Sequence, residues 1–163
     1  MSTKGTALAQ PIKVGPRTAK YRFVIQPMEC GDAINGGHLS DRAIRRYEKL
    51  MEGDAGIIDF ESITMQYDSR ARTNQLALYP NDPEDVKEWG KFIKHLKDIN
   101  PDPLFIVQLN HSGEISGGGD KIRYSVKPLY RYEGIEVTDE YADDVIKTRS
   151  RHQRYCTTSV LTA

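Results

Sequence analysis

The sequence is poor in cysteine, with only Cys30 and Cys156 among 163 residues. Two thiols so far apart build no disulfide framework, and this usage is typical of reduced, intracellular proteins. Long hydrophobic runs are also lacking: the longest, such as Phe105 to Val107, fall far short of the roughly 20 residues of a membrane helix. The first residues do not have the pattern of a signal peptide. These absences predict a cytoplasmic protein without a membrane partner.

An excess of either charge is lacking as well, because 23 Lys and Arg residues balance 23 Asp and Glu residues. A balanced chain gives no electrostatic reason to expect nucleic acid or an acidic membrane as the main partner. With 38% apolar and 28% charged residues, the composition is typical of a soluble globular protein of one domain. The function therefore has to be inferred from a site.

The first part of the chain predicts a short hairpin and one core strand. Residues 1–10 are small and polar, and we expect them to be disordered. Pro11 to Lys20 reads as two extended pieces joined at the turn dipeptide Gly15-Pro16. The run Phe23-Val24-Ile25 has the pattern of a short buried strand, which Pro27 ends because proline has no amide hydrogen to donate.

Two amphipathic helices follow. Ser40 is a good N-cap for a helix that starts at Asp41 and stops at Gly53. Asp82 and Pro83 open a second helix, since proline suits the first helical position. An apolar stripe at helical spacing marks its core side: Val86, Trp89, Phe92, Ile93 and Leu96.

Short apolar strands are predicted at Ile57 to Phe60 and at Leu104 to Leu109, so strands and helices alternate along the chain. This order predicts a parallel α/β sheet. Residues 110–137 then form an irregular segment, and Thr138 begins a last helix that we expect to end at Ile146. These features predict one domain at residues 11–146 and an atypical tail at 147–163.

Polar residues lie at the end of each predicted strand: Gln26 to Glu29, then Glu61 and Ser62, then Gln108 with Asn110, His111 and Ser112. In a parallel array of strands and helices, functional residues collect at the carboxyl ends of the strands. We therefore expect the candidate site at these three places.

Three blocks carry a resemblance to a known family. They are Arg22 to Glu29, Asp54 to Ser62, and Leu104 to Gly113, in this order and separated by two helices. Together they resemble the first three strand regions of the NADH:flavin oxidoreductases, the old yellow enzyme family. The resemblance implies an α/β fold, a partial TIM (β/α)8 barrel of about three N-terminal βα units preceded by a short hairpin.

The resemblance also implies FMN as cofactor, with NADH or NADPH as hydride donor and an activated alkene or similar molecule as acceptor. Six residues match positions that border the flavin ring in this family: Gln26, Pro27, Met28, Glu29, Ser62 and Gln108. A side-chain amide is both donor and acceptor, which matches the N–H and C=O groups of an isoalloxazine edge.

The sequence also departs from the family. Glu29 stands where well-known members have Thr or Cys, and Glu114 follows His-Ser-Gly where Arg is usual. A complete barrel takes about 250 residues, so five strands are missing, together with the substrate-binding pair, the tyrosine proton donor and the loops that hold the FMN phosphate. We therefore expect a truncated chain with little activity of its own. The rival hypothesis is a non-catalytic half-barrel that pairs with itself or with a complementary half-barrel.

For the other candidate features, a structural role is expected and not a functional one. A lone histidine such as His111 is more often structural than catalytic, and the four histidines lack a metal-binding spacing, which predicts no zinc site. Gly117 to Gly119 lacks the ending of a phosphate-binding loop. The arginines near residue 150 are expected to be solvated.

Overall fold

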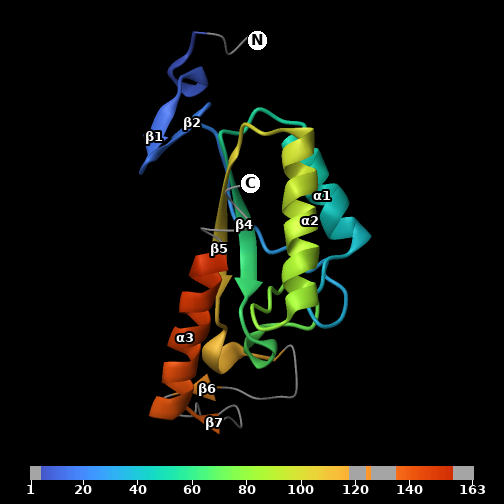
Figure 1. Cartoon of the computed structure of the whole chain (residues 1–163), viewed down its shortest axis with the longest axis vertical. Coiled ribbons are helices and arrows are strands. Elements are labelled where there is room, and N and C mark those ends of the chain that lie inside the picture. The colour runs from blue at the N-terminus through green and yellow to red at the C-terminus, as the bar shows by residue number, and fades with distance from the viewer. Residues whose placement is uncertain (1–4, 118–123, 126–134, 156–163) are drawn as a thin grey trace.

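The computed structural model describes residues 5–117, 124–125 and 135–155. The predicted hairpin is confirmed, because β1 (Ile12–Val14) pairs antiparallel with β2 (Arg17–Ala19) around Gly15, whose φ is +57°. It lies beyond the amino-terminal ends of the main strands, at the opposite end of the molecule from where β4 points (Figure 1). The first residues differ from the prediction: Ala7–Ala9 form a 3-10 turn, and the Leu8 carbonyl accepts a hydrogen bond from the Arg22 N–H.

A parallel sheet of order β3-β4-β5 occupies the centre, formed by β3 (Val24–Ile25), β4 (Ile57–Thr64) and β5 (Leu104–Asn110). Ile25 lies opposite Ile58, which lies opposite Phe105. The second strand continues past its predicted end, because its last residues still pair with Leu109 and Asn110. The predicted α/β fold, a partial barrel of three strands after a hairpin, is confirmed.

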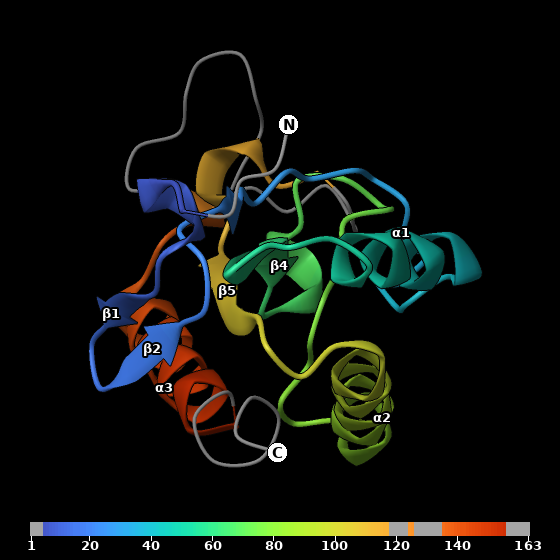
Figure 2. The same ribbon diagram turned by 90° about the horizontal axis from the view of Figure 1, so that it is seen from above.

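Helices α1 (Asp41–Met51) and α2 (Pro83–Ile99) form where the caps predict them. The Ser40 hydroxyl accepts the Ala43 N–H at 3.0 Å, and the Asp82 carboxylate accepts N–H groups of the first turn of α2. Helix α1 stops at Met51, two residues before the glycine predicted to stop it. Both helices lie on the same side of β4 when the molecule is viewed along the strands (Figure 2).

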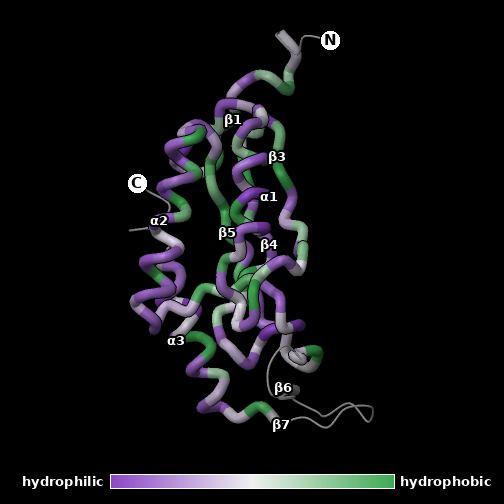
Figure 3. Tube along the Cα trace, turned by 90° about the vertical axis from the view of Figure 1, so that its right-hand side faces the viewer, coloured by the Kyte–Doolittle hydropathy of each residue, from purple (hydrophilic) through white to green (hydrophobic). Residues whose placement is uncertain are grey.

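The core lies between this side of the sheet and the two helices. Phe60 is fully buried and packs against four other aromatic rings. The distances between ring centroids are 4.5 Å to Tyr47, 5.3 Å to Phe105, 6.3 Å to Phe92 and 6.4 Å to Trp89. The predicted apolar stripe of α2 is confirmed as core, with Val86 at its partly buried margin. Hydrophobic residues accordingly gather along the central strands (Figure 3).

On the opposite face of the sheet, several apolar side chains are exposed within the described part of the chain. Side chains alternate along β5, so Phe105 and Val107 pack on the core while Ile106 and Gln108 point to the other face. Ile106 is 41% exposed and Val24 42%. The prediction that the first strand is buried is therefore wrong for Phe23 and Val24, because β3 pairs with β4 alone among the described strands.

Helix α3 (Asp139–Tyr155) is longer than predicted. It continues nine residues past Ile146, so the predicted helix end is wrong and the predicted tail is helical as far as Tyr155. Docking explains the difference, since Thr148 and His152 are buried and the His152 ring contacts the Leu78 carbonyl. Exposed residues of the same segment, including Arg149 and Arg151, hide this face in the sequence because they break the apolar periodicity.

Docking of α3 is expected to weaken as the pH falls. Burial lowers the pKa of His152, although hydrogen bonds with the carbonyls of Leu78 and Thr148 oppose the shift. Below the pKa of a free histidine, the unfolded chain therefore binds more protons than the folded chain. The stabilising contribution of neutral His152 is fully present above about pH 6.5 and is lost as the pH falls below it. The urea concentration at the midpoint of unfolding should be lower at pH 5.5 than at pH 7.5. This decrease should be smaller in the variant His152→Gln. An equal slope in both proteins would contradict this assignment.

Candidate functional site

The three predicted strand ends point to the same side of the sheet, because the strands are parallel neighbours. Gln26 directly follows β3, Ser62 lies near the end of β4, and Gln108 lies near the end of β5. Between the paired positions Phe60↔Val107 and Ile63↔Leu109, two residues of β4 face the single residue Gln108. The arrangement is a β-bulge, a feature that often re-aims side chains next to functional sites.

The bulge sends its two residues to different surroundings. Glu61 is 1% exposed and turns toward α1, whereas Ser62 is half-buried. Gln75, fully buried, donates from its amide to the Ser62 hydroxyl at 3.1 Å and to the Ser62 carbonyl at 2.9 Å. Ser62 is therefore fixed in place at the strand end, with Gln75 as a supporting residue that no sequence pattern indicated.

The loop from Gln26 to Ser40, called the β3–α1 loop below, presents its first side chains to solvent. Gln26 is exposed, Met28 is 70% exposed and Pro27 is half-buried. Glu29 forms an ion pair with Arg72, 2.9 Å from Nε to Oε1. The guanidinium lies on the connection that follows β4, so the carboxylate is turned toward that connection and its charge is balanced there.

A buried polar cluster lies beneath this loop. Arg46 of α1 binds the Asp32 carboxylate at 2.7 and 3.0 Å and also contacts Glu61. Burial raises the pKa of Glu61, while the Cys30 N–H and Arg46 oppose that shift. From the sequence, Glu61 could be identified only as a polar residue after a strand. No sequence pattern indicated that Arg46 and Asp32 would join it in a cluster.

His111 follows β5 but is held by structural contacts. Its Nδ1 accepts the Gly113 N–H at 3.0 Å, so Nε2 carries the proton and donates to the Tyr141 hydroxyl of α3 at 2.7 Å. Burial lowers the pKa of His111, which favours this neutral form. The contacts agree with the structural interpretation of this histidine.

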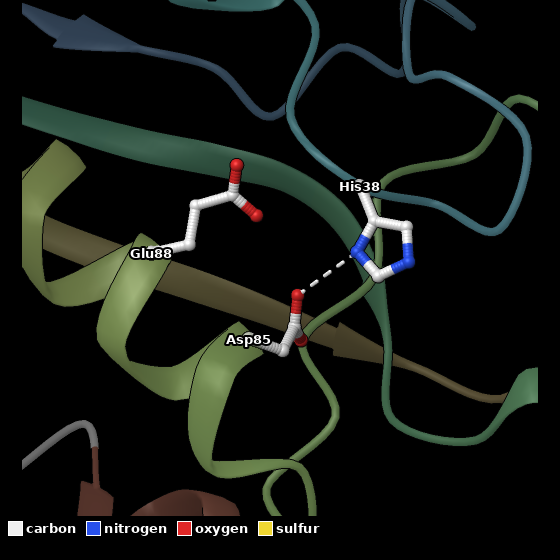
Figure 4. A group of neighbouring side chains, drawn as sticks. All are labelled: His38, Asp85 and Glu88. Carbon is white, nitrogen blue, oxygen red and sulfur yellow. Dashed lines mark hydrogen bonds and ion pairs between the residues drawn. The ribbon is translucent and has the colours of Figure 1, made fainter.

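A second cluster of titratable side chains lies away from the strand ends. It consists of His38, Asp85 and Glu88, whose potential metal-binding atoms lie within 4.8 Å of one another (Figure 4). Sequence spacing did not reveal it, because His38 and Asp85 are 47 residues apart. Asp85 accepts the Tyr79 N–H at 2.6 Å and meets His38 Nδ1 at 3.2 Å, so both of its oxygens already have partners. We therefore read this group as an anchor of the first turn of α2.

The fold and the site together define a class of protein. It is a (β/α) barrel protein whose barrel is not closed within the described residues and whose polar groups lie at the carboxyl ends of the strands. The family model described as NADH:flavin oxidoreductase / NADH oxidase matches residues 7–153. The chain belongs to this family, which uses FMN. A comparison with curated proteins gives no match.

Solved structures agree on the fold. The old yellow enzyme from Pichia sp. AKU4542 is 17% identical, with a TM-score of 0.82 over 98% of this chain and 45% of that one. The old yellow enzyme from Trypanosoma cruzi is 18% identical, with a TM-score of 0.75 over 94% of this chain and 48% of that one. A 2-naphthoyl-CoA reductase is 17% identical, with a TM-score of 0.76 over 96% of this chain and 26% of that one.

The chain thus spans less than half the length of these relatives. Among the described residues, no helix is both long and apolar enough to cross a membrane. The glycines Gly118 and Gly119, and Cys156, lie outside the described residues.

Proposed function

We propose that the chain forms part of the flavin site of an FMN-dependent NAD(P)H oxidoreductase of the old yellow enzyme type. The observation that supports it is that Gln26, Ser62 and Gln108 lie at the ends of three parallel neighbouring strands, on the carboxyl side of one sheet. In α/β folds this edge is where ligands bind. Family membership makes FMN the expected ligand.

The residues at this edge fit an isoalloxazine edge. Gln26 and Gln108 are exposed, so their amides are available as donors and acceptors, and Met28 offers an apolar, polarizable surface to a flat ring. When bound, FMN would accept hydride from NAD(P)H and pass it to an activated alkene or similar acceptor. Gln26, Pro27, Met28, Glu29, Ser62 and Gln108 would hold and orient the ring.

Full activity requires more of the fold than this chain has, because the relatives are more than twice as long. We therefore expect little turnover from this chain alone. The first test is the visible absorbance spectrum of the purified protein before and after addition of FMN, followed by gel filtration. Flavin that stays with the protein supports the proposal and justifies an NADPH oxidation assay. Protein that elutes colourless from excess FMN would overturn it.

Gln108→Ala is expected to weaken FMN binding about tenfold, because an amide that pairs with the ring edge is removed. Quenching of flavin fluorescence measures the dissociation constant. Gln10→Ala is the matched control, since Gln10 is also exposed but lies beside the amino-terminal turn. An unchanged dissociation constant in Gln108→Ala would remove Gln108 from the site.

A second candidate function is a half-barrel interaction module. The observation that favours it is the open face of the sheet, where Val24 and Ile106 are exposed and Asp59 Oδ1 has no hydrogen-bond partner within the described part of the chain. Burial raises the pKa of Asp59. A partner that covers this face would bury both apolar side chains and supply a donor to Asp59.

Light scattering coupled to gel filtration tests this second function. A stable assembly that contains no flavin favours the module, whereas an assembly that retains FMN favours the oxidoreductase. A monomer at all concentrations contradicts self-pairing.

A further inference from the structure

The β3–α1 loop is tied down at five successive residues although its first side chains face solvent. The contacts are Glu29 with Arg72, the Cys30 N–H with Glu61, the Gly31 carbonyl with the Asn74 amide at 2.5 Å, Asp32 with Arg46, and the Ala33 N–H with the Asn74 carbonyl at 3.2 Å. Surface loops are normally among the least constrained parts of a fold. This loop is ordered by contacts from α1, β4 and the connection after β4.

Glu61 makes one of these contacts itself and is joined to a second, that of Asp32, through Arg46. Its Oε2 accepts the Cys30 N–H at 3.0 Å, and its Oε1 meets the Arg46 guanidinium and, at 3.4 Å, the Tyr47 hydroxyl. The same hydroxyl accepts the Glu61 N–H at 3.2 Å. Both carboxylate oxygens and the backbone amide are therefore occupied, which is what a side chain only 1% exposed requires.

Arg46 extends the hold to a second point of the loop. It binds Asp32 through two nitrogens and reaches Glu61 with one of them, so a single guanidinium joins α1, β4 and the loop. The hydrogen bonds to Asp32 and the field of Glu61 raise the pKa of Arg46 despite its burial. A planar fork with fixed donors suits this bridging role, which a lysine cannot reproduce.

The β-bulge links this cluster to the candidate flavin edge. In a regular strand Phe60 and Ile63, three residues apart, would face opposite sides of the sheet. Because the bulge adds one residue between them, both are buried in the core. The insertion lets Glu61 turn toward the loop while Ser62 stays at the strand end. One irregularity of β4 therefore serves both the loop and the strand edge.

We propose that Glu61 is a positioning residue whose carboxylate, with Arg46 and Asp32, holds the β3–α1 loop in its flavin-receiving conformation before flavin binds. The inference rests on the proposed function, because it takes the loop as a border of FMN. Ligand sites of this kind depend on supporting contacts that fix the residues touching the ligand.

Hydrogen exchange of the Ala33 amide, followed by NMR, tests the hold without any flavin. The Ala33 N–H bonds to Asn74 and not to Glu61, so its protection reports the loop and not the deleted contact. Glu61→Gln keeps the side-chain shape but presents a neutral amide to Arg46, and the protection of Ala33 should fall about tenfold. The Val86 amide of α2 serves as the internal reference.

Glu48→Gln is the matched control, since Glu48 is also a carboxylate with a basic partner, the exposed His95 of α2, which lies outside the cluster of Asp32, Arg46 and Glu61. It should leave Ala33 protection unchanged. Arg46→Lys is the second variant, for use if Glu61→Gln does not fold, and it should loosen Ala33 in the same way. Unchanged protection of Ala33 in the folded variant would overturn the proposal.

The second readout is FMN binding by fluorescence quenching, with the absorbance band shape of bound flavin at saturation. Glu61→Gln should raise the dissociation constant about tenfold and change the band shape, because the loop no longer holds its place. A looser loop with unchanged FMN binding in Glu61→Gln would overturn the flavin role. If the unmodified protein binds no FMN while Ala33 loosens in the variant, the proposed function fails and the hold on the loop stands.

Discussion

Phe60→Ala is expected to destabilise the protein by about 3–5 kcal/mol, because truncating a large core side chain removes its buried area and leaves a cavity. Phe60 is fully buried and contacts rings from β5, α1 and α2. Those rings come from three elements, so the cavity cannot collapse by a shift of one side chain. A loss of this size is a large part of the 5–15 kcal/mol that stabilises a typical domain.

Urea unfolding followed by circular dichroism measures this effect. Phe23→Ala is the control, because Phe23 is 42% exposed and its truncation should cost less than about 1 kcal/mol. The comparison separates burial from residue type. Equal losses in the two variants would contradict the assignment of the core to the helix side of the sheet.

Gly56→Ala is expected to destabilise by at least about 3 kcal/mol, because the new methyl group meets rigid backbone. A Cβ at this position would lie 1.8 Å from the Tyr21 carbonyl oxygen and 2.6 Å from its carbon. The neighbouring chain cannot move away freely, since the Gly56 N–H binds the Phe23 carbonyl at 2.9 Å and the Gly56 carbonyl accepts the Leu104 N–H at 2.9 Å.

Gly90→Ala is the matched control with the opposite sign. Gly90 lies inside α2 and a Cβ there meets nothing within 4 Å, so alanine should stabilise by about 0.5–1 kcal/mol through helix propensity. Thermal unfolding measures the effect of both substitutions, because the melting temperature shifts by about 2–4 °C per kcal/mol at this chain length. A melting temperature of Gly56→Ala equal to that of the unmodified protein would refute the close approach.

The ion pair between Glu29 and Arg72 bears on the departure of Glu29 from the family pattern. A carboxylate beside a flavin would disfavour the anionic reduced form, and Glu29 stands where well-known members of the family have Thr or Cys. In the structure the charge of Glu29 has a partner at 2.9 Å. The departure from the family pattern is therefore matched by a second residue that is 43 positions away.

Local signals were enough to predict the helices and the fold class. Capping by Ser40 and Asp82 depends on neighbours within three residues, and the stripe of α2 depends on helical periodicity, so both are readable along the chain. The family resemblance was readable for the same reason, because its blocks are continuous segments at strand ends. The end of α3 was not readable, since its buried residues Thr148 and His152 are polar.

The candidate site divides in the same way. Sequence order alone placed Gln26, Ser62 and Gln108 near the ends of consecutive strands, because parallel strands must bring their carboxyl ends to one side of the sheet. The bulge that turns Glu61 away from Ser62, and the joining of Asp32, Arg46 and Glu61, were decided only by tertiary structure. Such polar contacts depend on distances between residues far apart in the chain, and they leave no periodic pattern from which packing can be predicted.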